Sequence, residues 1–94
     1  MITAVVMIST EAASIPEAAR AIADVDGITE VYSVTGDVDL IAIVRVRRHE
    51  DLADVIADKV SKTPGVVNTE TYIAFQTYAK QDLDTAFTLG LDDA

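Results

Sequence analysis

The sequence predicts an α+β fold in which four strands and two helices follow one another in the order β-α-β-β-α-β. Three observations predict it: four runs rich in β-branched residues, two amphipathic segments with helix start and stop signals, and turn residues at the junctions between them. The chain has 94 residues, which suffices for one domain built around one hydrophobic core.

The first half of the pattern is a strand, a helix and a second strand. Residues 3–9 are apolar and β-branched over the length of a strand. Ser14 precedes Glu17 by three residues, the spacing of a capping box that starts a helix. Gly27 is suited to end that helix in a left-handed conformation, ahead of a strand over residues 28–34. The apolar stripe of the helix consists of Ile15, Ala18, Ala19 and Ile22.

The second half repeats this order after a hairpin over residues 35–38. A long central strand is predicted over residues 39–46, then a helix that begins near Glu50 and Asp51 and ends before Pro64 and Gly65. The apolar stripe of this helix consists of Leu52, Val55, Ile56 and Val60. The last strand lies within residues 66–77, with Val67, Thr69, Thr71, Ile73 and Phe75 on one side. This is the ferredoxin-like βαββαβ arrangement: a four-stranded antiparallel sheet with two helices on one face.

The other face of the sheet is predicted to dimerise. Alternation along the third strand points Leu40, Ala42, Val44 and Val46 toward the helices. Ile41 and Ile43 then lie on the open face together with Arg45 and Arg47. Hydrophobic residues make up 50% of the chain, and its mean hydropathy is +0.28, so apolar surface is left over for a partner. We therefore expect dimers that pack through their open sheet faces.

Charge and composition exclude several classes of partner. Sixteen acidic residues against seven Lys and Arg give a formal net charge of −9, which disfavours direct nucleic-acid and membrane binding. The apolar first residues lack a basic segment before them and end at Ser9, too early for a signal peptide or a membrane span. Cysteine is absent, which fits a cytoplasmic protein.

The residues that could carry catalysis are few. The chain has no Cys, one His and no Gly-rich phosphate loop, and His49 is interpreted as a surface or capping residue. Asp37 and Asp39 flank Val38, but their spacing fits neither an EF-hand loop nor a zinc site. The sequence therefore predicts no catalytic residue, no metal site and no cofactor.

Two motifs resemble one family. Val34-Thr35-Gly36-Asp37-Val38-Asp39-Leu40 resembles the V-T-G-x-x-D-h hairpin of the Lrp/AsnC effector domain, also called the RAM domain. Pro64-Gly65-Val66-Val67-Asn68-Thr69-Glu70-Thr71 is similar to the P-G-V-x-x-T-x-T entry into its last strand. The resemblance implies that residues 1–78 form an effector-binding domain. Residues 79–94 form a tail that we interpret as a docking segment, with Leu83, Ala86, Phe87 and Leu91 at near-helical spacing.

The resemblance implies a site for amino acids or related small effectors between subunits, with the hairpin as its main wall. Asp37 or Asp39 would accept the ammonium group, and Gly36 would let the backbone approach the ligand. Backbone amides of the turn and the hydroxyls of Thr69 and Thr71 would receive the carboxylate. The predicted ligand-binding residues are Thr35, Gly36, Asp37, Val38, Asp39, Thr69 and Thr71.

The resemblance also implies a homo-oligomeric sensor in the regulation of amino-acid metabolism. The first strand begins at once, without the family's helix-turn-helix, so no direct DNA contact is expected, and a full-length family regulator is a further candidate partner. Val38 stands where many relatives have an aromatic residue, so the pocket for the effector's side chain is expected to differ. Two alternatives stay open: a small dimeric α+β barrel enzyme such as a monooxygenase, and a purely structural assembly module.

Overall fold

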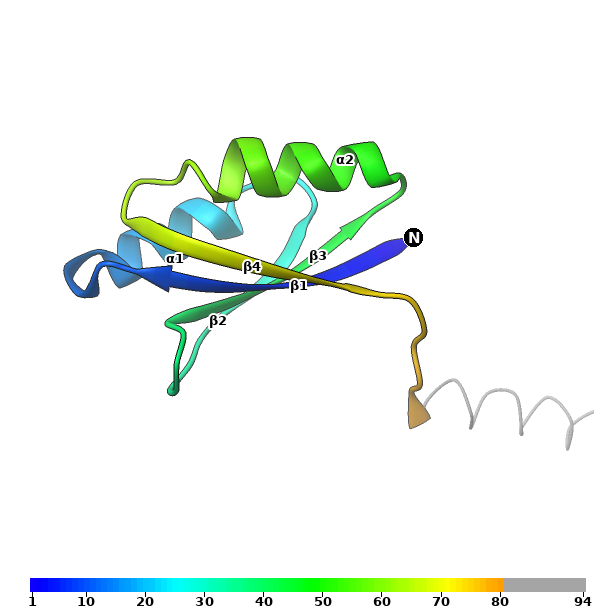
Figure 1. The fold of residues 1–94 in the computed structure, drawn as a ribbon, viewed down its shortest axis with the longest axis horizontal. Coiled ribbons are helices and arrows are strands. Elements are labelled where there is room, and N and C mark those ends of the chain that lie inside the picture. Colours follow the sequence, from blue (N-terminus) through cyan, green and yellow to red (C-terminus); the bar gives the residue numbers. More distant parts are fainter. Residues whose placement is uncertain (81–94) are drawn as a thin grey trace, which may run out of the picture.

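A computed structural model of the protein describes residues 1–80, and the predicted order of strands and helices is confirmed (Figure 1). Residues 81–94, which include most of the predicted docking tail, lie outside the described residues. The elements are β1 (Ile2–Thr10), the short 3-10 turn η1 (Ala12–Ser14), α1 (Ile15–Ala23), β2 (Ile28–Ser33), β3 (Leu40–Val46), α2 (His49–Ala53) with its continuation η2 (Asp54–Val60), and β4 (Val66–Ala74).

The four strands form one antiparallel sheet in the order β2-β3-β1-β4, and both helices cover the same face of it (Figure 1). In the centre, Val5 of β1 lies opposite Ile43 of β3, and Met7 lies opposite Ile41. The edge strand β4 has a bulge, because Thr10 pairs with Val66 and Ser9 with Asn68, which leaves one extra residue in β4. β2 and β4 are therefore the two free edges of the sheet.

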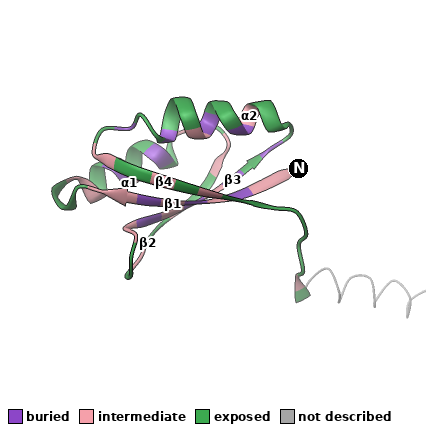
Figure 2. Ribbon diagram, in the orientation of Figure 1, coloured by how far each residue is buried: buried purple, intermediate pink, exposed green. Residues whose placement is uncertain are grey.

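The core lies between the sheet and the helices (Figure 2). The predicted inward side of the third strand is confirmed, because its even-numbered residues are buried and Ile41 and Ile43 on the open face are only partly buried. The two helices contribute the apolar stripes predicted for them. The buried apolar residues are Ala4, Val6, Ile8, Ala18, Ile22, Leu40, Ala42, Val44, Val46, Leu52, Val55 and Val60.

The alternation predicted that Arg47 would share the open face with Arg45, and this was wrong. β3 ends at Val46, so the strand periodicity stops there, and Arg47 instead lies beside a hollow between the helices. A strand pattern places side chains only as far as the strand itself continues.

The helix starts and ends also differ in detail from the prediction. Ser14 is the N-cap residue of α1, but its side chain makes no capping hydrogen bond, so the capping box was wrong. Its backbone has φ −109° and ψ 6° instead of the extended conformation of a capping residue, since η1 already turns the chain there. Gly27 does have a positive φ of 98°, but α1 ends at Ala23, one turn earlier.

The second helix widens after one turn. η2 is a π-helix, in which the Ser61 N–H donates to the carbonyl oxygen of Ile56, five residues back, at 2.9 Å. The wider turn brings Val55 and Val60, also five residues apart, to the same side of the helix, and both are buried. Among residues 1–80 no helix is long and apolar enough to cross a membrane.

Candidate functional site

The connection between β2 and β3 is a tight hairpin that extends away from the helix layer (Figure 1). At its base the Val34 N–H donates to the carbonyl oxygen of Asp39 at 3.1 Å. At its tip Gly36 has a φ of +122°, a conformation that side chains with a Cβ rarely adopt. No heavy atom lies within 4 Å of the position that a Cβ on Gly36 would take, so the backbone is open to an approaching molecule.

Asp39 fixes this hairpin to β1. One of its carboxylate oxygens accepts a hydrogen bond from the Thr10 N–H at 2.8 Å. The Asp39 N–H in turn donates to the carbonyl oxygen of Ile8 at 2.9 Å. Asp39 is partly buried, whereas Asp37 at the tip is exposed. The two carboxylates therefore differ in their surroundings: Asp39 holds the hairpin, and Asp37 is exposed at its tip.

The hairpin and the open sheet face border a hollow of about 700 Å³ that is open to solvent. Its lining combines an exposed carboxylate, two hydroxyl side chains and an apolar floor made by neighbouring strands. The lining residues are Met7, Ser33, Val34, Thr35, Asp37, Val38 and Ile41. Such a site can attract a cationic group at Asp37 and hold an apolar group above Met7 and Ile41.

The structure brings the predicted hairpin residues together but not the predicted threonines. Thr35, Asp37 and Val38 line the hollow. Thr69 and Thr71 lie on β4, and two strands separate β4 from β2. Both threonines are turned toward the second helix: the Thr69 hydroxyl lies 3.3 Å from the Ser61 hydroxyl, and Thr71 lies beside α2. Within one chain the two groups of predicted residues do not form a single site.

Four lining residues were not among the predicted site residues: Met7, Ser33, Val34 and Ile41. Ile41 had been placed on the open face but not assigned to the site. Met7 reaches the hollow because antiparallel pairing sets it opposite Ile41. The alternation within each strand indicates which of its residues share a face. Only the register between β1 and β3 places Met7 beside the hairpin, and Met7 and Ile41 are more than thirty residues apart in the sequence.

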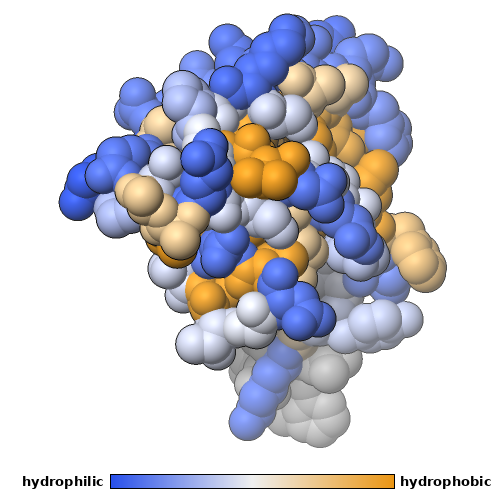
Figure 3. All heavy atoms as spheres, turned by 60° about the vertical axis from the view of Figure 1, so that its left-hand side comes forward, coloured by the Kyte–Doolittle hydropathy of each residue, from blue (hydrophilic) through white to orange (hydrophobic). Residues whose placement is uncertain are grey.

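An apolar strip runs along the centre of the open face. It consists of Val5, Met7, Ile41 and Ile43, which pair across β1 and β3 and are only partly buried. Figure 3 shows apolar side chains exposed in patches between hydrophilic ones on the face that it presents. In a single chain this strip faces water.

Each edge strand carries the same short motif on that face. Thr-Glu-x-Tyr occurs at residues 29–32 in β2 and at residues 69–72 in β4. The Tyr32 hydroxyl donates to the Glu30 carboxylate, and the Tyr72 hydroxyl donates to the Glu70 carboxylate. These hydrogen bonds are the main reason why the pKa of each phenol is raised. The apolar strip is thus bordered on both sides by a tyrosine–glutamate pair.

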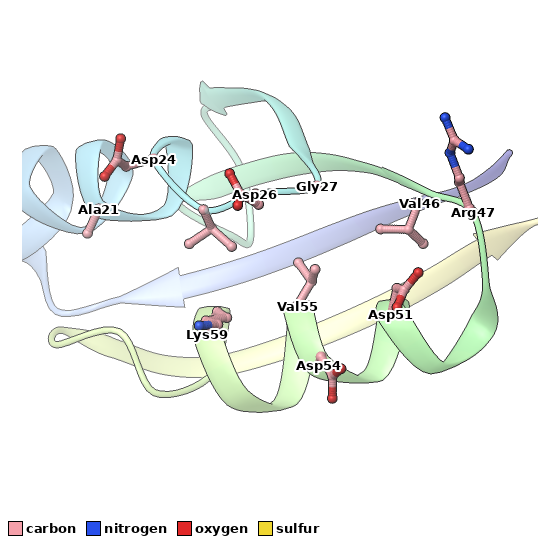
Figure 4. A pocket seen from close by; sticks show the side chains of 11 residues that line it. Ala21, Asp24, Asp26, Gly27, Val46, Arg47, Asp51, Asp54, Val55 and Lys59 are labelled. Atoms are coloured by element: carbon pink, nitrogen blue, oxygen red, sulfur yellow. The ribbon is translucent and has the colours of Figure 1, made fainter.

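A second hollow, of about 580 Å³, lies on the opposite side of the sheet between the two helices (Figure 4). Its apolar floor includes Val25, Val46 and Val55, while the charged rim consists of Asp24, Asp26, Asp51, Asp54, Arg47 and Lys59. Within residues 1–80 no three His or acidic side chains are grouped so that they could hold a metal ion. The predicted surface position of His49 is confirmed, since it is exposed at the start of α2.

The chain matches the family model of the Lrp/AsnC ligand-binding domain over residues 3–83. Among curated proteins it is similar to the HTH-type transcriptional regulator FL11 of Pyrococcus horikoshii, with 32% identity over 80% of this chain and 49% of that protein. The chain therefore spans about half the length of the curated relatives that it matches first.

Solved structures agree with this match. The protein TTHA0845 from Thermus thermophilus has a TM-score of 0.81 and 41% identity, over 85% of this chain and all of that chain. A feast or famine regulatory protein from M. tuberculosis, solved in complex with L-methionine, has a TM-score of 0.69 and 25% identity, over 86% of this chain and 55% of that chain.

Proposed function

The chain belongs to the Lrp/AsnC ligand-binding domain family, and from this premise we propose that it binds an amino acid or a related small metabolite as a homo-oligomeric sensor. The observation that carries the proposal is the hollow at the hairpin, with an exposed carboxylate beside an apolar floor. A relative in the same family was solved with L-methionine, a molecule with an ammonium group and an apolar side chain.

In the proposed complex, Asp37 accepts hydrogen bonds from the ligand's ammonium group. Gly36 admits the ligand close to the backbone, and amides of the turn donate to its carboxylate. The ligand's side chain lies over Met7 and Ile41, with Val38 shaping the rim.

In this proposal the remaining predicted residues either position the hairpin or contribute from another subunit. Asp39 positions the hairpin through Thr10 and does not contact the ammonium group. Thr69 and Thr71 contribute only when another subunit brings its β4 to the hairpin, since they lie far from the hollow of their own chain. The site would then be complete only in an assembly of subunits.

The proposed oligomer buries the apolar strip of the open face against a second copy. Burial of apolar surface contributes roughly 25 cal/mol per Å². The four residues of the strip, Val5, Met7, Ile41 and Ile43, lie in two adjacent strands and form a continuous surface that a second sheet can cover. This supports packing of two sheets face to face.

The proposed role is regulatory and non-catalytic. The matched curated relatives are named transcriptional regulators, which supports regulation over the monooxygenase alternative. A net charge of −9 opposes direct contact with phosphate backbones, so the bound state is read through another protein, for which a full-length family regulator is the candidate. A gel shift at low salt should then show no sequence-specific DNA retention by this chain.

Calorimetry tests the binding site. A thermal-shift screen across the twenty amino acids first identifies the effector, because a ligand that binds the native state raises its melting temperature. Asp37→Ala should then weaken binding about tenfold to a hundredfold, since a hydrogen bond to a charged group contributes roughly 1.5 to 3 kcal/mol. Glu17→Ala, which removes an exposed carboxylate from α1, is the control. Equal affinity in both variants would place the site elsewhere, and no binding by the parent would favour an assembly module.

A further inference from the structure

The outer side of the second helix and the edge strand β4 leave an apolar groove uncovered by residues 1–80. The groove has a volume of about 300 Å³ and is lined almost entirely by apolar atoms. It is formed by His49, Leu52, Ala53, Ile56, Ala57, Thr71 and Ile73. Half of the Ile73 surface is exposed, and the aromatic residues that follow, Phe75 and Tyr78, are 96% and 87% exposed. These residues form an exposed apolar patch of the kind that marks an interaction site.

Arg48 directly precedes His49, which lines one end of the groove. Arg45 and Arg47 are near in the sequence but lie elsewhere, Arg45 on the open sheet face and Arg47 beside the hollow between the helices. Arg48 pairs with Glu50 and Asp51, whereas Arg45 and Arg47 form no salt bridge within residues 1–80. Only Arg48 adjoins a groove residue, and its side chain is exposed, so it can also meet an acidic partner.

The C-terminal sequence has the complementary properties. Residues 81–94 contain four Asp and neither Lys nor Arg, and their apolar residues recur at the spacing of one helix face: Leu83, Ala86, Phe87 and Leu91. The family model ends at residue 83, so most of this segment lies beyond the part that the family model matches.

The path of the chain indicates which copy of the groove the segment can reach. After β4, residues 75–80 run away from the helix layer and toward the side of the open sheet face (Figure 1). The chain's own groove lies in the other direction, on the helix side of the sheet. Six extended residues span up to about 20 Å, and stacked sheets lie about 10 Å apart. The segment therefore leaves toward the position of a second copy packed on the open face, and the linker is long enough to pass that copy's sheet.

We propose that residues 82–91 of one chain dock in the α2–β4 groove of a second copy, with Phe87 and Leu83 against Ile56 and Ile73 and an aspartate beside Arg48. The exchange is reciprocal, so each copy gives and receives one segment. This inference rests on the face-to-face assembly of the proposed function, which it strengthens by tying the two chains together at their ends.

Disulfide cross-linking tests the exchange directly, because the native chain has no cysteine. Ala57→Cys places a thiol in the groove, and Ala86→Cys places one on the apolar side of the segment; Ala57 is exposed and small. The two single variants, one carrying a mass tag, are mixed and oxidised. Ala23→Cys, at an exposed alanine of α1 outside the groove, replaces Ala57→Cys in the control mixture.

We expect a disulfide between the tagged and untagged chains with Ala57→Cys and little with Ala23→Cys. Adding Phe87→Asp to the Ala86→Cys chain should abolish the link by putting a charge in the groove, whereas Thr88→Asp, with the same charge on another side of the segment, should preserve it. A dimer mass by light scattering without the cross-link would overturn the exchange and leave the assembly intact. In a third sample, one chain carries both Ala57→Cys and Ala86→Cys; a disulfide that forms only within this chain would also overturn the exchange. A monomer mass would overturn both proposals.

Discussion

Replacing Asp39 by alanine should destabilise the fold, and the structure gives the size of the effect. The Asp39 carboxylate accepts the Thr10 N–H at 2.8 Å, and this contact joins residues 29 positions apart in a partly buried place. Alanine leaves that N–H without its acceptor, and a hydrogen bond to a charged group contributes roughly 1.5 to 3 kcal/mol. We therefore expect the free energy of unfolding to fall by about 2 kcal/mol.

Urea unfolding at a fixed protein concentration measures this loss, with melting as a second measurement. For a domain of this size, 1 kcal/mol corresponds to a Tm change of roughly 4 to 8 °C. Asp37→Ala is the matched control, because it removes the same charge from the same hairpin at an exposed position and should change stability by less than about 0.5 kcal/mol. Asp39→Asn keeps an acceptor oxygen and should lose less than Asp39→Ala. If Asp39→Ala and Asp37→Ala unfold at the same urea concentration, Asp39 does not hold the hairpin.

Three further predictions follow from the sheet and its turns. Ile43→Asp should convert the assembly to monomers in light scattering at micromolar concentration, because it puts a charge in the apolar strip; an unchanged mass would argue against the open face as the interface. Gly65→Ala should lower the free energy of unfolding by roughly 1 to 3 kcal/mol in urea, because φ is +90° there and the added Cβ would lie 2.5 Å from the Ser14 Cβ. Ultraviolet titration should show Tyr32 and Tyr72 ionising above the ordinary phenol pKa of about 10, and each Tyr→Phe variant should remove one such transition. Because these pKa values are raised on folding, the stability from both pairs is present below the ordinary pKa and is lost as the pH rises through the raised values.

The fold could be predicted from the sequence where burial follows a local period. Residues 40–46 alternate between core and open face. This period of two can be read from the sequence because it follows from the geometry of a single strand. The bulge at Val66 to Asn68 and the π-helix could not be predicted. Both depend on how one element fits against another, and no residue type specifies them. The capping box failed for the same reason, since the turn before Ser14 had already fixed its backbone.

The sequence could predict which residues form the hairpin but not the rest of the hollow that they line. The hairpin residues share a short stretch of sequence, so a motif was enough to collect Thr35, Asp37 and Val38. The role of Asp39 was not visible, because its partner Thr10 is 29 residues away and becomes a neighbour only when β1 enters the sheet. Thr69 and Thr71 remain predictions for a site shared between subunits.

The attachment of Asp39 to β1 also bears on how strongly the hairpin would hold the proposed ligand. Fixing the backbone of a free residue costs roughly 1 to 2 kcal/mol, and each 1.4 kcal/mol changes a dissociation constant tenfold. Because both ends of the four-residue turn are already held, little of that entropy would be lost when the proposed ligand binds. A few weak contacts at the tip can then give useful affinity. Removing the contact between Asp39 and Thr10 at the base of the hairpin should weaken binding of the proposed ligand without altering any atom that this ligand touches.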